Sequence, residues 1–455
     1  MNGWFQVCTL ADDRSAKPAQ LRPRPVRNLC CISLNFPPSS IASVHRARHL
    51  AKYLPDYGWQ PTIICADERD LDETPDWRLH ELVPKDALVH KVRGIPLSLT
   101  RVFGITDLGL RTFWSLRKEL TKLAQETHFD AIFITGWPFY QMLLSRRLKS
   151  LFRAPLVLDF QDPWISAWGS AQSVFSKAGV AHHLATALEP RAVRNADFVT
   201  SVSEVQNAEM AARYPWLDAN RMAAIPIGGD PDDFSVLRDS PLGDFEYQLD
   251  PGCMHLSYVG TLLPRAGGLL RVLFRAFAQF RRNKPALAAR VRLNFVGTSN
   301  QANDTGTFRV LPIAEAEGVG DAVREVPRRL PYLDALSVLA RSDGVLLIGS
   351  DEPHYTASKI YPGLMSGRPF LSLFHPASSA HSVLSAAGGG YAFAYEGDKH
   401  APELEEAMAD ALATMVGLNR SLKGANPSAS LPFEARSIAG TFAAIFDRLA
   451  SEKLL

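Results

Sequence analysis

The chain has 455 residues, of which 46% are apolar and 21% are charged, and this composition is typical of a folded globular protein with two or three domains. Its 49 Lys and Arg residues against 47 Asp and Glu residues leave a net charge of only +2, which excludes the basic excess of a dedicated nucleic-acid binder. The five cysteines are scattered without any Cys-x-x-Cys spacing, so we expect neither disulfides nor a structural zinc site.

The amino-terminal end differs in character from the rest of the chain. Residues 1–25 contain several Pro, Arg and Lys residues and show no sustained apolar period, which predicts a flexible basic arm. They lack the basic start and apolar centre of a secretory signal, and no apolar run in the chain approaches the roughly 18 to 20 residues that span a bilayer. We therefore expect a soluble, cytoplasmic protein.

The first half of the chain alternates between strand-like and helix-like segments. Val26–Leu34 is a strand-length apolar run, and the helix predicted over Val44–Leu54 places its apolar residues on one face. An apolar strand, Thr62–Ala66, comes next, and this order of strand, helix and strand predicts parallel strands. The alternation continues with strands expected at Ala131–Thr135, Leu156–Phe160 and Phe198–Val202 and a helix at Val180–Asn195.

A second series of the same kind begins at Leu256. Its strands are expected at Val291–Val296, Gly344–Ile348 and Phe370–Phe374, and its helices at Leu269–Phe280, Tyr332–Arg341 and Glu403–Val416. Between the two series, residues 226–252 are rich in Pro, Gly and Asp, the composition of a linker or of a loop at the edge of a cleft. We therefore predict two doubly wound α/β domains, over residues 26–225 and 226–430.

The loops that follow the strands carry the candidate functional residues, because ligands of open α/β sheets bind beyond the carboxyl ends of the strands. Gly260–Gly268 precedes a strong helix, so its backbone N–H groups and Arg265 are suited to an anion such as a diphosphate. Lys359, at the start of a later helix, could pair with a second phosphate charge. A solvated Arg and a solvated Lys are the simpler alternatives, and the Gly-x-Gly-x-x-Gly fingerprint of dinucleotide sites is absent.

A second candidate group lies in the sequence LDFQDPW, residues 158–164. Asp162 could orient or deprotonate a sugar hydroxyl, and Trp164 could pack against a pyranose face. The alternative is that Asp159 and Asp162 bind loop backbone donors while Trp164 fills the floor of the domain. The histidines, His45 among them, show no metal-ligand spacing and are expected to be structural or solvated.

Read together, these loops resemble retaining GT-B glycosyltransferases, specifically the glycosyltransferase family four group of bacterial polysaccharide biosynthesis. The resemblance runs from about Leu29 to Leu449. Its motifs are short, but their order and spacing together are specific. They are Asn35–Pro38, Ser43–Arg46, Ala51–Trp59, Leu158–Trp164, Thr200–Ser203, Ile225–Asp230, Tyr258–Leu262, Ser358–Tyr361 and Ser366–Pro369.

The resemblance implies two Rossmann-like domains facing across a cleft, with an acceptor domain at 26–225, a donor domain at 226–430 and a carboxyl-terminal segment, 431–455, that crosses back. It implies a hexosyltransferase that uses a nucleotide sugar, UDP- or GDP-linked, without metal or cofactor, and that transfers to a glycan or lipid-linked acceptor with retention. The implied catalytic residues are Arg265, Lys359 and Asp162, with Arg265 and Lys359 on the diphosphate. The implied donor-binding residues are Gly260, Thr261, Gly297, Glu352, His354, Ser358 and Tyr361, and the acceptor-side residues are Ser39, Ser40, Arg46, Trp137 and Trp164.

One departure from the family pattern keeps other functions open. Pro362 stands where the family carries the acid that contacts the nucleotide ribose, and a Pro side chain accepts no hydrogen bond. One alternative is a catalytically idle GT-B protein that serves as a binding or scaffold partner in a polysaccharide-assembly complex. Another is a sugar-nucleotide epimerase on the same two-domain layout.

The stretch 94–123 suggests a peripheral membrane contact. It carries basic and aromatic residues side by side, so a basic amphipathic helix could lie on anionic lipid at the inner face of the plasma membrane. Ordinary core packing with a solvated basic face is the alternative. No nucleic-acid partner is expected.

Overall fold

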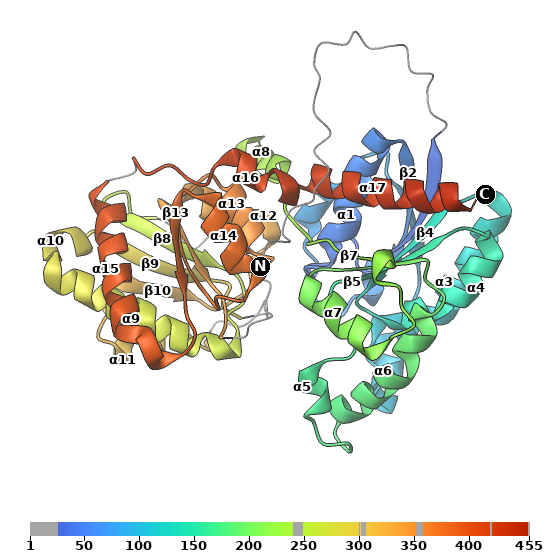
Figure 1. The fold of residues 1–455 in the computed structure, drawn as a ribbon, viewed down its shortest axis with the longest axis horizontal. Helices are drawn as coiled ribbons and strands as arrows, with labels where there is room; N and C mark the ends of the chain where they lie inside the picture. The colour runs from blue at the N-terminus through green and yellow to red at the C-terminus, as the bar shows by residue number, and fades with distance from the viewer. Residues whose placement is uncertain are drawn as a thin grey trace, which may run out of the picture.

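The computed structural model describes residues 26–239, 249–299, 301, 306–351, 358–418 and 421–453. The predicted basic arm, residues 1–25, and residues 240–248 of the predicted linker lie outside these residues. Two parallel sheets, of seven and six strands, form the centres of two α/β units joined by two chain crossings (Figure 1). The predicted pair of doubly wound units is confirmed.

The first sheet has the strand order β3-β2-β1-β4-β5-β6-β7, and every neighbouring pair is parallel. Its central strands are apolar and buried on both faces, as expected where helices cover a parallel sheet on each side. The strands are β1 (Arg27–Ile32), β2 (Trp59–Ala66), β3 (Leu88–Val92), β4 (Ala131–Gly136), β5 (Leu156–Phe160), β6 (Phe198–Ser201) and β7 (Met222–Ala224).

Helices pack on both faces of this sheet through separate apolar clusters. One face is covered by α3 (Leu108–Glu126), α4 (Ser145–Phe152), α6 (Lys177–Val193) and α7 (Glu204–Arg213). The other face is covered by α1 (Val44–Tyr53) and by the last helix of the chain, α17 (Ala435–Glu452). Figure 1 shows α17 lying along the first domain beside α1.

The second sheet has the order β10-β9-β8-β11-β12-β13 and is also parallel throughout. Helices α9 (Gly267–Asn283) and α15 (Ala401–Gly417) cover one face, and α12 (Tyr332–Arg341), α13 (Ile360–Met365) and α14 (Ser379–Ala387) cover the other. The strands are β8 (Met254–Val259), β9 (Val291–Val296), β10 (Val323–Val326), β11 (Gly344–Ile348), β12 (Phe370–Phe374) and β13 (Gly390–Ala394).

The two chain crossings between the domains lie side by side. The Gly229 N–H donates to the Phe433 carbonyl at 3.1 Å, and the Ala435 N–H donates back to the Gly229 carbonyl at 2.7 Å. Gly228 has a φ of 72°, and a Cβ at this position would lie 2.3 Å from the Phe433 carbonyl oxygen. A glycine is therefore required where the outgoing and returning segments touch.

Two sequence expectations need correction. The predicted linker contains a helix, α8 (Pro231–Asp239), which packs between the domains through polar contacts described below. The predicted amphipathic segment 94–123 does not form one surface helix, because Leu108, Leu116, Leu120 and Leu123 of α3 are buried in the core of the first domain. Core packing, the alternative stated for this stretch, is what the structure shows. Among the helices of the described residues, none combines the length and the apolar character needed to cross a membrane.

Candidate active site

A cavity of about 430 Å³ lies between the two domains. The first domain contributes the loop between β1 and α1, the start of α1 and the segment around Asp76, and the second contributes the loops that follow β8, β9 and β10. Of the predicted site residues, this cavity gathers Ser40, Gly260, Thr261, Gly297, Ser358 and Lys359. Loops that follow the carboxyl ends of strands in both sheets therefore meet at one site, and this is where ligands of open α/β sheets bind.

Lys359 lies directly before α13 and points toward the strand end of β8. Its Nζ donates to the Thr261 carbonyl at 3.2 Å and to the Tyr258 hydroxyl, and it lies 4.3 Å from the centre of the Tyr258 ring. No carboxylate pairs with it among the described residues. Because burial disfavours the charged amine, the pKa of Lys359 falls to about 7.

This pKa predicts a pH-dependent affinity for a nucleoside diphosphate. An anion binds best to the protonated amine, which is the main form below pH 7 and is lost as the pH rises above it. We expect the dissociation constant to increase between pH 7 and 9, by at most about tenfold per pH unit. Calorimetric titration at several pH values measures this. Lys359→Arg keeps its charge throughout and should show a flat profile; an identical rise in that variant would contradict the assignment.

Arg265 does not line the cavity. It lies in the short 3-10 turn Pro264–Ala266 directly before α9, its side chain is 59% exposed, and its Nε forms an ion pair of 2.7 Å with Asp351. Of the two cations that sequence analysis placed on one diphosphate, only Lys359 lines this cavity. The role of Arg265 stays a prediction, and it requires the side chain to leave Asp351.

A different cation, Arg329, lines the cavity. It follows β10 and donates to the Ser40 carbonyl, so it bridges the two domains. No ion pair within 4 Å is present for it among the described residues. Burial lowers the pKa of Arg329, and the nearby Glu73 and Asp76 carboxylates offset only part of this effect. Sequence analysis missed this residue because β10 was not predicted, and its following loop was therefore not counted among the strand-end loops.

Asp162 lies in a smaller recess of about 220 Å³ that shares Ile41, Ala42, Ile227 and Ser358 with the main cavity. Tyr361 also lines this recess. The carboxyl group is open to solvent on one side, but the surrounding protein removes enough water to raise its pKa to about 6. Asp162 can therefore accept a proton near neutral pH.

The remaining predicted residues divide between surface and interior. Ser39 is buried and donates to Glu73, and Trp137 is exposed. Trp164 stacks on Phe139 with ring centres 5.2 Å apart. Its packing agrees with the alternative in which this side chain fills the floor of the domain. Glu352 and His354 lie outside the described residues.

Arg46 occupies the interior and not the cavity. It is 1% exposed, its Nε pairs with Asp159 at 3.1 Å, and its other nitrogens donate to the carbonyls of Ile225 and Pro226. Asp159 also accepts from the Thr200 hydroxyl at 2.7 Å. Arg46 therefore has no open face with which to bind an acceptor, because its N–H groups hold α1 against the first chain crossing.

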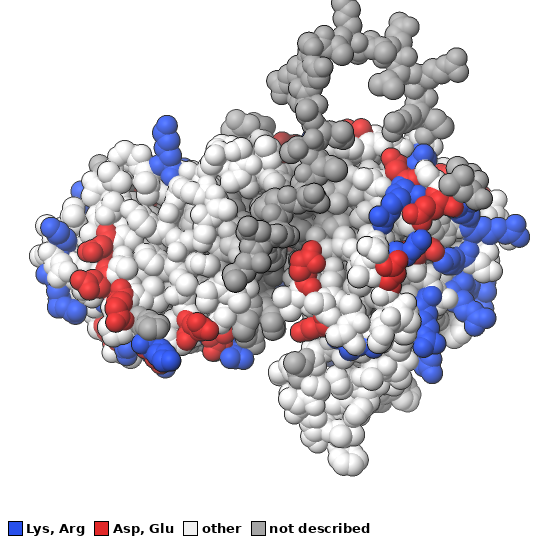
Figure 2. Space-filling view, in the orientation of Figure 1, with Lys and Arg blue, Asp and Glu red and all other residues white. Residues whose placement is uncertain are grey.

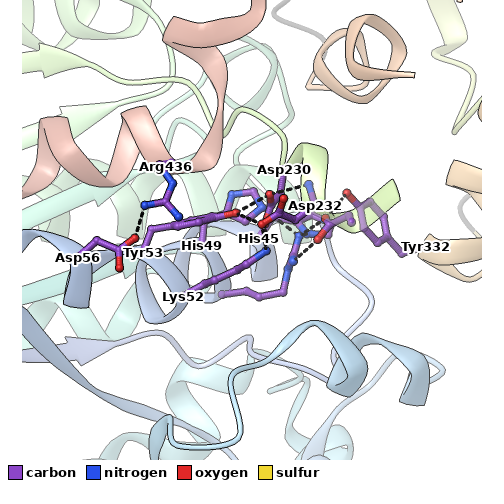
Figure 3. A network of polar contacts seen from close by, with 11 residues as sticks. His45, His49, Lys52, Tyr53, Asp56, Asp230, Asp232, Tyr332 and Arg436 are labelled. Carbon is purple, nitrogen blue, oxygen red and sulfur yellow. Dashed lines mark hydrogen bonds and ion pairs between the residues drawn. The ribbon is translucent and has the colours of Figure 1, made fainter. Parts of the chain in front are cut away.

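A buried polar network lies beside the cavity and contributes His45, His49 and Tyr332 to its lining; Figure 3 shows this network. Arg48 of α1 forms two hydrogen bonds to Asp233 of α8, at 2.8 and 2.6 Å, and Tyr332 of α12 donates to the same carboxylate at 3.0 Å. The Tyr53 hydroxyl and the Lys52 amine bind Asp230 at 2.7 and 2.8 Å. These contacts join three helices, namely α1 of the first domain, α8 of the chain crossing and α12 of the second domain.

His45 belongs to this network and lines the cavity. Arg48 Nη2 lies 3.1 Å from its Nδ1, and because a guanidinium only donates, this contact favours the tautomer in which Nδ1 accepts and Nε2 carries the proton. Burial and the neighbouring Arg48 and Arg329 charges hold the pKa of His45 well below its usual value. His45 therefore presents a neutral N–H. Sequence analysis expected only a structural or solvated histidine at this position.

His49, Asp230 and Asp233 come close enough together to suggest a metal site, with ligand atoms within 4.8 Å of one another. Their lone pairs already accept hydrogen bonds from Arg48, Lys52 and Tyr53. Two of these donors are cations that would repel a metal ion, so the chemistry of this cluster is that of a salt-bridge network.

Solved structures with the same arrangement identify the fold as GT-B. The Anabaena HepE structure in complex with UDP and glucose is 16% identical, with a TM-score of 0.54, and the match covers 93% of this chain and 100% of that one. An α,α-trehalose 6-phosphate synthase from Burkholderia multivorans is 14% identical, with a TM-score of 0.56 and coverage of 94% and 100%. A Listeria monocytogenes protein named as a UDP-N-acetylglucosamine 2-epimerase is 12% identical, with a TM-score of 0.50 and coverage of 93% and 96%. At these identities the likeness shows the fold alone.

Sequence comparison is more specific for the first domain. Residues 43–228 match the glycosyl transferase 4-like domain. This segment contains Asp162 and, among the residues that line the main cavity, His45, His49, Asp76 and Leu79. No curated protein sequence matches the chain.

Proposed function

We propose that this protein is a metal-independent, retaining glycosyltransferase that moves a hexose-type sugar from a nucleotide donor to a glycan or lipid-linked acceptor in polysaccharide assembly. The observation that carries the proposal is Lys359, an amine without a carboxylate partner in the described residues, in a cavity between two domains. The match of residues 43–228 to a glycosyl transferase 4-like domain supports it. The fold's occurrence in HepE, which was solved with UDP and glucose, favours a UDP-linked sugar over a GDP-linked one.

The geometry suggests how the chain's own residues would divide the work. Lys359 and Arg329 would neutralise the departing diphosphate, a role in which fixed positive groups replace a metal ion. His45 would donate its Nε2 proton to an oxygen of the bound ligand. Asp162, in the adjoining recess, would orient the acceptor hydroxyl and accept its proton.

The role of Asp162 gives a direct prediction. Asp162→Asn keeps the shape of the side chain but removes the base, so we expect transfer to fall by about two to three orders of magnitude. Affinity for the donor nucleotide should stay within about twofold, because the main cavity is unchanged. Initial rates and calorimetric titration measure the two quantities. A nucleotide affinity that falls as much as the rate would contradict an acceptor-side role.

Incubation with a panel of UDP- and GDP-linked sugars tests the function as a whole. Release of nucleoside diphosphate that depends on an acceptor supports transfer. An epimerised donor would instead support an epimerase, the activity named for the Listeria neighbour. Absence of binding to every nucleotide sugar would support the idle binding protein that the proline at position 362 suggested.

A further inference from the structure

The recess that holds Asp162 differs in charge from the cavity that it joins. Among the described residues, Lys359 and Arg329 line the main cavity, whereas no Lys or Arg lines the recess. Asp162 is the only carboxylate there, and its pKa of about 6 leaves it mostly ionised above pH 7. In Figure 2, the charged side chains in view where the first domain faces the second are Asp and Glu, and Lys and Arg gather mainly on the opposite side of that domain. A phosphate group in the recess would therefore meet a negative charge without the cations that phosphates require.

Three hydroxyl groups also line the recess, and they belong to Ser43, Ser358 and Tyr361. Burial raises the pKa of Tyr361, so its phenol stays protonated and can donate a hydrogen bond. The Asn35 amide donates to the Ser43 hydroxyl at 3.0 Å, which leaves the Ser43 proton available for an acceptor. Neutral groups that both donate and accept are suited to the hydroxyl groups of a sugar.

Gln161 adds a hydrogen-bond acceptor to the recess. The residue lines the recess, is 5% exposed, and donates from its Nε2 to the Asp159 carboxylate at 3.2 Å. Because a carboxylate only accepts, this contact favours the amide orientation in which the nitrogen lies against Asp159. The amide oxygen, Oε1, then has no hydrogen-bond partner among the described residues. A buried polar atom without a partner is costly, and a hydroxyl group of a ligand would supply that partner.

We propose, resting on the function proposed above, that the acceptor is a neutral sugar residue and not a phosphate, with one hydroxyl on Asp162 and a neighbouring hydroxyl on Gln161. The two side chains are adjacent in the chain, directly after β5, and both line the recess. The oxygen of the first hydroxyl forms the new bond to the anomeric carbon of the donor, and its proton passes to Asp162. The diphosphate leaves with the electron pair of the old bond. The second hydroxyl does not react and only positions the ring.

This acceptor class places the chain within a reaction sequence. A lipid-linked acceptor is compatible with the recess only if a sugar already covers its phosphate. An earlier transfer of a sugar or of a sugar phosphate must supply that residue. The protein would therefore extend a glycan and not start one.

Small acceptor analogues test the class of acceptor directly. The full chain is saturated with UDP or GDP, whichever binds, so that the cations of the main cavity are occupied. Binding of methyl glycosides of several neutral hexoses is then compared with binding of methyl phosphate by saturation-transfer NMR at pH 7.5. We expect at least one glycoside to bind at least about tenfold more tightly than methyl phosphate, because the phosphate faces a like charge.

Two results of this comparison would overturn the proposal. One is methyl phosphate that binds as tightly as every glycoside, and the other is a failure of all the glycosides to bind. The proposed function fails in a different way, because a chain that binds neither UDP nor GDP would refute that function and this inference together. Nucleotide binding combined with the wrong acceptor class would refute this inference alone.

Gln161→Met tests the second hydroxyl, since it removes the amide oxygen at nearly constant volume. We expect the preferred glycoside to bind about three- to tenfold more weakly, the effect of one hydrogen bond between neutral groups. The deoxy glycoside that lacks the hydroxyl on Gln161 should bind the wild type equally weakly and lose nothing further in the variant. The affinity for the nucleotide should be unchanged, because Gln161 does not line the main cavity.

Gln141→Met is the matched control. Gln141 is 0% exposed, its Nε2 donates to the Thr135 carbonyl at 2.9 Å and its Oε1 also has no partner among the described residues, but it lines neither the recess nor the main cavity. It should bind the glycoside as the wild type does, and equal weakening by both substitutions would contradict the role of Gln161. If Gln161→Met does not fold, the deoxy glycosides decide with the wild type alone. A series in which only the attacked hydroxyl affects binding would overturn the assignment.

Discussion

Lys359→Ala should lower the rate of sugar transfer by at least about two orders of magnitude. The amine lies in the interdomain cavity, bound to a backbone carbonyl and a phenol, and can turn its charge toward a diphosphate that becomes more negative as the glycosidic bond breaks. Loss of one well-placed electrostatic stabiliser typically costs about 3 to 4 kcal/mol in the transition state. Initial rates at saturating donor measure the effect. Because Lys359 forms no ion pair within the described residues, the melting temperature without ligand should change little.

Arg265→Ala is the informative comparison for this experiment. Arg265 is more than half exposed and already paired with Asp351, so solvent and the carboxylate both weaken its action on a phosphate. We expect its removal to reduce transfer by about tenfold or less, well below the effect at Lys359. Equal rates in wild type and Lys359→Ala would mean that the phosphate site has been assigned to the wrong loops.

The central strands of both sheets were predictable because they are buried on both faces. The predicted bounds of β5, β9, β11 and β12 agree with the structure residue for residue. All four strands that sequence analysis missed, β3, β7, β10 and β13, are edge strands. An edge strand is partly exposed and does not carry the continuous apolar run that marks a central strand, as the partly exposed pattern of β7 illustrates.

The same physical reason explains what was missed in the candidate site. Lys359, Ser358 and Gly260 follow central strands or lie between them, so strand-end reasoning located them. Arg329 follows an edge strand and was overlooked. His45 belongs to the polar face of α1, a face that amphipathic periodicity assigns to solvent. In the folded chain that face packs against α8 and α12, and such a contact between distant segments leaves no periodic signal in the sequence.

The polar face of α1 also determines how the two domains are held together. Arg48 and Asp233 are 0% and 1% exposed, so their charges depend on each other and on the surrounding hydrogen bonds. Asp76 of the first domain adds a further contact by accepting from the Tyr332 N–H at 2.7 Å, at the start of α12. Tyr332 and His45 both line the cavity, and the relative position of the domains at the candidate site therefore depends on this network.

Asp233→Ala should lower the free energy of unfolding by about 3 to 5 kcal/mol, because it leaves the Arg48 guanidinium buried without its partner. Tyr332 would also lose its acceptor. Urea titration followed by circular dichroism measures the loss. Asp232→Ala is the control, since the Asp232 side chain is 62% exposed and its ion pair should contribute no more than about 1 kcal/mol.

The double substitution Arg48→Met with Asp233→Leu removes both charges, so it should lower the free energy of unfolding less than Asp233→Ala alone does. A double variant as unstable as the single one would show that hydrogen bonds from Arg48 to His45 and His49, and not the unpaired charge, account for the loss.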